Sequence, residues 1–125
     1  MALPDGLILV DDTVERPFIT IRNLYITFSK LSIELLENAE YVHLFVDNAK
    51  KIVVFQACEN DKAAIPFFKK PEEGKQVLVR ITGKKNAMRL MEMAGITDCG
   101  KGIRIYGDFL PEDKALLFDL SHIEN

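Results

Sequence analysis

The chain has 125 residues, of which 48% are hydrophobic and 28% are charged, and its formal net charge is −3. This length fits one domain with a buried core and excludes two ordinary domains, while the composition excludes a disordered tail. The sequence has no apolar run of about 18 residues, so it predicts no transmembrane helix. Residues 1–15 are acidic where a secretory signal would be basic and apolar, so we expect a cytoplasmic protein without a membrane partner.

In chain order, the first half predicts two strands, a helix and a hairpin. Alternating apolar residues indicate the strands, and Leu31, Leu35 and Ala39 recur at the spacing of one helix face. Ser29, just before them, is a residue type that begins helices. The predicted strands are 18–22, 24–28, 42–47 and 51–55, with the helix between the second and the third.

The second half predicts the same kinds of element. A half-buried strand leads to Ile81, and a helix follows in which Leu90, Met91 and Ala94 share one side and Gly95 is the expected end. A hairpin follows, with strands at 103–108 and 114–118. Between the halves, residues 57–75 contain three proline or glycine residues and are interpreted as a linker with an apolar patch at 65–68.

The two halves align with each other. Residues 26–41 laid over 81–96 give six identities in sixteen positions. The later hairpin strands also match in order, 42–47 with 103–108 and 51–55 with 114–118. Such matches indicate two copies of one strand–helix–strand–strand unit, at about 18–56 and 76–120. Because Leu35 and Leu90 align on the inner helix side, we expect both to be buried, and we expect Met88 and Met91 to pack in the core.

This unit resembles the swapped-hairpin barrels of the AbrB and MraZ transition-state and cell-division regulators. Those proteins carry a stretch similar to V-T-I-P-K where the second strand opens the helix. Residues 26–30 (ITFSK) and 81–85 (ITGKK) occupy that place here, without the proline. MraZ-like proteins also hold two copies in one chain. The resemblance covers about 18–120 and implies a barrel and DNA binding.

The sequence therefore predicts a single α+β domain over 1–125, in which two βαββ repeats form one pseudo-twofold, swapped-hairpin-like barrel. The alternative is an open sheet with two helices on one face, because a βαββ unit can also pack its helix on such a sheet.

Catalytic chemistry finds little support in the sequence. His43 lies in an apolar strand and is interpreted as a structural histidine, and Cys58 and Cys99 lack the spacing of zinc or redox sites. The Gly83–Lys85 segment lacks the earlier glycine and the Ser or Thr of a phosphate-binding loop. We therefore expect no enzyme, no catalytic residue, no metal site and no cofactor.

The basic residues suggest a different function. Residues 16–107 hold 15 of the 16 bases and have a net charge of +5, between two acidic ends of −4 each. A basic face on this middle part would hold phosphates regardless of base sequence. The candidate DNA-binding residues are Arg22, Lys30, Arg80, Lys84, Lys85 and Arg89. The hypothesis is a non-enzymatic regulator that binds double-stranded DNA. The alternative is a protein-interaction or structural module, a homo-oligomer included, that uses the 65–68 patch or a sheet edge.

Overall fold

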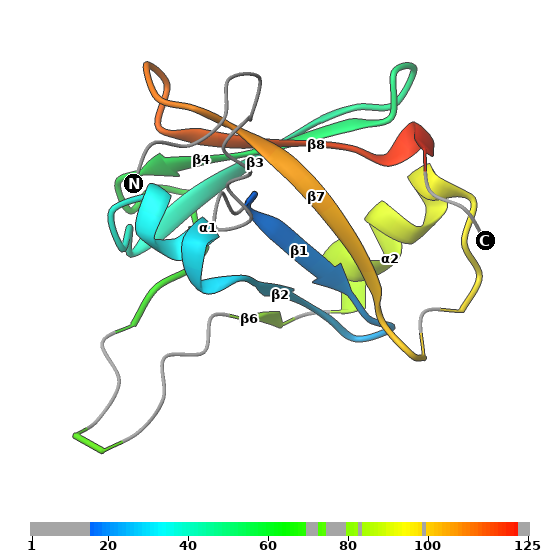
Figure 1. The fold of residues 1–125 in the computed structure, drawn as a ribbon, viewed down its shortest axis with the longest axis horizontal. Helices are drawn as coiled ribbons and strands as arrows, with labels where there is room; N and C mark the ends of the chain where they lie inside the picture. The colour runs from blue at the N-terminus through cyan, green and yellow to red at the C-terminus, as the bar shows by residue number, and fades with distance from the viewer. Residues whose placement is uncertain (1–15, 70–72, 75–79, 83, 99, 123–125) are drawn as a thin grey trace, which may run out of the picture.

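A computed structural model describes residues 16–69, 73–74, 80–82, 84–98 and 100–122 (Figure 1). The fold is α+β: an antiparallel sheet that curls around two helices. The strands are β1 (Phe18–Ile21), β2 (Tyr25–Phe28), β3 (Tyr41–Asp47), β4 (Ile52–Cys58), β5 (Ile65–Pro66), β6 (Arg80–Thr82), β7 (Ile103–Leu110) and β8 (Ala115–Asp119). The helices are α1 (Lys30–Leu35) and α2 (Lys84–Ala94), with a short 3-10 turn, η1, at Leu120–His122.

The strands lie in the order β5-β3-β4-β8-β7-β1-β2-β6. β7 joins the two parts of the sheet because it pairs with β8 near its end and with β1 near its start. All pairings are antiparallel, and β5 and β6 are the edges within the described residues. The predicted α+β class is confirmed, whereas the two-copy barrel stays a prediction.

Alternation of apolar residues builds the core. Ile19 and Ile21 on β1, and Ile26 and Phe28 on β2, turn to one side and are buried, whereas the residues between them are only half-buried. Buried side chains of both helices join the same core, so the helices lie on the inner side of the curl. The outer side of the sheet remains solvent-facing over much of β3 and β7.

Helix α1 is shorter than its sequence pattern suggested and buries a different side. It has six residues, because Glu37 and Asn38 take left-handed conformations and the Asn38 N–H donates to the Ile33 carbonyl oxygen (3.0 Å). Ile33 and Leu36 are buried, while Leu35 is only partly buried, so the expectation for Leu35 was wrong. Ile33 and Leu36 have helical spacing, and so do Leu31 and Leu35. Periodicity alone does not tell which of these two sides of the helix packs against the core.

Serine side chains fix α1 against β1. The Ser29 hydroxyl accepts the Ser32 N–H (3.2 Å) and caps the helix, as its position suggested. Ser32 is fully buried, and its own hydroxyl donates to the Phe18 carbonyl oxygen (3.2 Å). A buried hydroxyl is tolerated here because it is hydrogen-bonded.

Residues 57–69 of the predicted linker are more structured than a linker, and residues 70–72 and 75 lie outside the described residues. β4 continues to Cys58, and β5 pairs with β3 through Ile65 opposite Val42. Phe67 is 7% exposed, and its ring lies 4.7 Å from that of Phe28. The 65–68 segment therefore packs into the protein's own core and is not a free surface patch.

Truncation of Leu90 tests the inner face of α2. This side chain is fully buried, so Leu90→Ala should lower the free energy of unfolding by about 2–5 kcal/mol, the usual loss when a buried leucine leaves a cavity. The aligned Leu35→Ala is the matched control and should cost less than about 2 kcal/mol, because Leu35 is only partly buried. Urea unfolding measures both, and equal losses would contradict the packing described here.

Candidate nucleic-acid interface

Pairing between β2 and β6 brings two remote basic segments together. Tyr25 lies opposite Thr82 and Ile26 opposite Ile81. The β1–β2 turn, which contains Arg22, precedes Tyr25, and the Arg22 N–H donates to the Tyr25 carbonyl oxygen (2.9 Å). On the other strand, Thr82 leads within two residues to the start of α2. The turn and the helix start therefore lie at the same end of the β2–β6 pair (Figure 1).

Helix α2 is amphipathic. Its inner side is formed by Ala87, Leu90, Met91 and Met93, all buried. Lys84 and Lys85 are exposed in the first turn, where the positive end of the helix dipole adds to their charge. Met88, expected in the core, is 41% exposed because it lies on the outward side with these lysines.

The exposed side of α2 continues toward the β3–β4 turn. Arg89 follows Lys85 by one helical turn, and it borders a shallow hollow of about 600 Å³ that Lys51 also lines. Glu92, in the same hollow, is an acidic member of this surface. We name the basic set the α2 strip: Arg22, Lys51, Lys84, Lys85 and Arg89.

The backbone at Gly102 passes close to the side chains of Thr20 and Arg22. An added Cβ at Gly102 would lie 2.9 Å from the Thr20 methyl group and 3.1 Å from the Arg22 guanidinium carbon. Gly102 also has a φ of +78°, which favours glycine. Nearby, the Asn23 side chain donates to Asp98 (3.0 Å), which ties the β1–β2 turn to the α2–β7 loop. Hydrogen bonds from Asn23 and from the Gly100 N–H lower the pKa of Asp98.

The six candidate DNA-binding residues thus fall into separate groups. Arg22, Lys84, Lys85 and Arg89 lie in the α2 strip. Lys30 starts α1 at the opposite end of the β2–β6 pair, because antiparallel strands leave in opposite directions, and its ammonium is 3.9 Å from Glu34. Arg80 lies on β6 opposite Thr27, between the two ends. The sequence did not indicate Lys51 as part of this surface. Lys51 lines the same hollow as Arg89 only because the β3–β4 hairpin folds toward α2.

His43 has an acidic partner that the sequence did not indicate. Its Nε2 lies 2.9 and 2.8 Å from the two carboxylate oxygens of Asp61. Asp61 also accepts the Ala63 N–H (2.9 Å) and so shapes the β4–β5 connection. The hydrogen bond from His43 is the largest cause that lowers the pKa of Asp61. This geometry suits the structural role expected for His43.

Cys58 is the neighbouring thiol. Burial and the charge of Asp61 raise its pKa, so it is a poor nucleophile at neutral pH. In the described part of the chain, no three His, Cys, Asp or Glu residues gather as a metal site would require. Cys99 lies outside the described residues.

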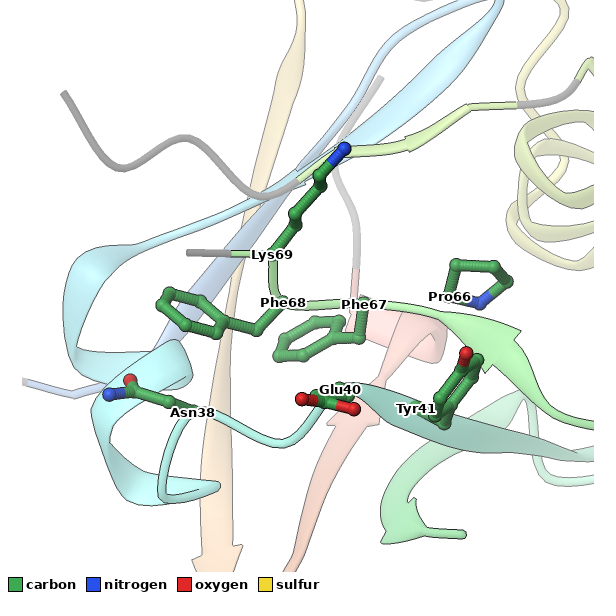
Figure 2. A pocket seen from close by; sticks show the side chains of 7 residues that line it. All are labelled: Asn38, Glu40, Tyr41, Pro66, Phe67, Phe68 and Lys69. Atoms are coloured by element: carbon green, nitrogen blue, oxygen red, sulfur yellow. The ribbon is translucent and has the colours of Figure 1, made fainter. Parts of the chain in front are cut away.

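A second hollow, of about 430 Å³, lies between the α1–β3 connection and β5 (Figure 2). It is lined by Asn38, Glu40, Tyr41, Pro66, Phe67, Phe68 and Lys69. The Phe67 N–H donates to the Glu40 carbonyl oxygen (2.8 Å), and the Phe68 N–H donates to that of Ala39 (3.0 Å). These bonds join the 67–68 segment to the α1–β3 connection. The polar lining of the hollow consists of one carboxylate, one ammonium group, one phenol and one amide, from Glu40, Lys69, Tyr41 and Asn38.

Comparison with protein-family models, curated proteins and solved structures finds no match for this chain. No helix among the described residues is long and apolar enough to cross a membrane.

The His43–Asp61 contact predicts a pH-dependent stability. A lowered pKa in the folded state means that ionised Asp61 stabilises the fold above the ordinary value of 3.8, and that this contribution is lost as the pH falls through the lowered pKa. Asp61→Asn should therefore lower the urea midpoint at pH 7, and the difference from the parent protein should shrink below about pH 4. An equal difference at pH 7 and pH 3 would exclude ionised Asp61 as its source.

Proposed function

We propose that this protein is a non-enzymatic regulator that binds double-stranded DNA through the α2 strip. The observation that supports this most is the β2–β6 pairing, which brings the turn that contains Arg22 to the same end of the strand pair as the lysines that begin α2. Lys and Arg hold phosphates by charge, and the N–H groups of a helix start add to the attraction. DNA is the ligand class that such a strip fits best.

We also propose that the chain is built as two copies around a pseudo-twofold axis, as in the swapped-hairpin barrels. In β2–β6, Ile26 faces Ile81, and in β4–β8, Val54 faces Leu117. Each of these residues faces its own counterpart in the sequence alignment. When a twofold axis passes between two antiparallel strands, the residue nearest the axis pairs with its own counterpart in the other copy. The element order βαββ also occurs twice, as β2-α1-β3-β4 and β6-α2-β7-β8.

The strip would bind through release of counterions from the duplex, which makes affinity fall as salt rises. Its acidic neighbours, Glu92 and Asp98, weaken the field locally but leave five bases against two acids. No base-reading side chain is required for this binding, so we propose sequence-tolerant binding to the backbone.

A protein-interaction module is the second candidate function. On the outer side of the sheet, Phe45 lies opposite Val54, and Val54 lies opposite Leu117. The Phe45 side chain is 51% exposed. Val54 and Leu117 are half-buried, and a partly exposed apolar row of this kind favours contact with another protein or a second copy. This row takes the place of the 65–68 patch as the candidate interaction surface, because the 65–68 segment packs into the core.

Salt-dependent binding to a random duplex tests the DNA proposal. Three or four phosphate contacts should give a slope of roughly −3 to −4 in a plot of log affinity against log salt, at about −0.9 for each contact. Lys84→Glu with Lys85→Glu should weaken binding and flatten this slope by about two units.

The matched control is Lys30→Glu with Lys62→Glu, which changes the net charge equally but away from the strip. This control should keep most of the parent slope. No duplex binding at low salt, or equal losses in the two double variants, would refute the α2 strip as the DNA site.

A further inference from the structure

The outer side of β7 and β1 gathers aromatic and arginine side chains from distant parts of the chain. Phe18 on β1 lies opposite Tyr106 on β7, and Thr20 lies opposite Arg104. Their neighbours Ile19, Ile21 and Ile105 are buried, so these alternate positions turn outward. We name this set the aromatic–arginine face: Arg16, Phe18, Thr20, Arg104 and Tyr106.

Direct contacts arrange this face. The rings of Phe18 and Tyr106 lie 5.5 Å apart and meet edge to face at 60°. The Arg104 guanidinium lies over the Phe18 ring, 4.1 Å from its centre, as a cation–π contact. Tyr106 remains 48% exposed, and Arg104 is exposed as well. One tyrosine ring and the outer side of one guanidinium therefore remain open to a flat ligand.

The charge of the face indicates what that ligand is. Arg104 and Arg16 are positive, and the acid beside them, Asp108, is 3.4 Å from Arg16. That pair is exposed, with 59% and 69% of the two side chains accessible, so it holds Arg16 only weakly. An open ring, an open guanidinium plane and excess positive charge together suit a ligand with flat rings and phosphates.

We propose that the aromatic–arginine face binds single-stranded nucleic acid. One base stacks on Tyr106 and a neighbouring base stacks on the Arg104 plane, while the arginines contact the backbone phosphates. Phe18 holds Arg104 in place, so less side-chain freedom is lost on binding. A duplex does not fit this mode, because its bases are stacked on each other and their faces are hidden.

This site and the α2 strip meet only at Arg22, whose guanidinium lies near the Thr20 methyl group beside Gly102. Otherwise the strip follows the exposed side of α2, and the face follows the outer side of β7 and β1. The inference therefore goes beyond the proposed duplex binding and can fail or hold independently of it.

Fluorescence anisotropy with labelled 20-nucleotide dT, 20-nucleotide rU and a random duplex tests the proposal at low salt. The protein should bind at least one of the single strands, and the two arms distinguish DNA from RNA. Tyr106→Ala should weaken that binding at least about fivefold, the lower end of what one lost base–aromatic stack costs. Tyr106→Phe should retain it, because stacking needs the ring and not the hydroxyl.

Two controls separate this site from the others. Phe45→Ala removes an equally exposed ring elsewhere on the outer sheet and should leave single-strand binding within about twofold. Lys84→Glu with Lys85→Glu should impair duplex binding while the Tyr106 dependence of single-strand binding persists.

Arg104→Gln provides a second variant in case Tyr106→Ala unfolds, because Arg104 is exposed and its loss opens no cavity in the core. It should also weaken single-strand binding. The proposal is overturned if neither single strand binds, if folded Tyr106→Ala or Arg104→Gln binds as tightly as the parent, or if the face instead drives self-association that excludes the oligonucleotide.

Discussion

The antiparallel pairing of β2 with β6 is the constraint on which the rest of this structure depends. Within the described residues, three residues on each strand take part. Their central pair, Ile26 and Ile81, is 0% and 2% exposed and lies in the same core as Leu90 of α2. Apolar burial therefore compensates for a short ladder. If β6 slipped by one residue against β2, Ile81 would turn outward and leave the core.

The same pairing determines how charge is distributed. It sets the β1–β2 turn beside the start of α2 and sends α1 to the opposite end, so bases that align in the sequence do not share a surface. The inner side of the curl is filled by both helices, which leaves the outer side of β7 and β1 free for the aromatic–arginine face. Two surfaces of different chemistry result, one of which suits a duplex backbone and the other unstacked bases.

Sequence patterns predicted the order of most elements because alternation and helical spacing are local. The strands around Ile19 and Ile26, the helix ending before Gly95 and the buried Leu90 follow from such patterns. The buried side of α1 did not, because Ile33 and Leu36 compete with Leu31 and Leu35 at equally good spacing. β5 was also missed, since a two-residue strand with a proline has no pattern of its own.

Contacts between distant residues were beyond sequence reasoning. Asp61 follows His43 by 18 positions in a loop with no distinguishing motif. Phe18 and Tyr106 meet only because β7 pairs with β1, and 88 positions separate them in the sequence. The basic residues of α2 were found because they cluster locally.

One measurement tests most directly whether the β2–β6 pairing creates a joint DNA surface. In a titration of the isotope-labelled protein with a random duplex, backbone amide shifts should change together at 22–25 and 84–89, two segments about 60 residues apart in sequence. Amides at 30–34, at the start of α1, should remain unchanged. Changes confined to one of the two segments, or equally large changes at 30–34, would contradict the account.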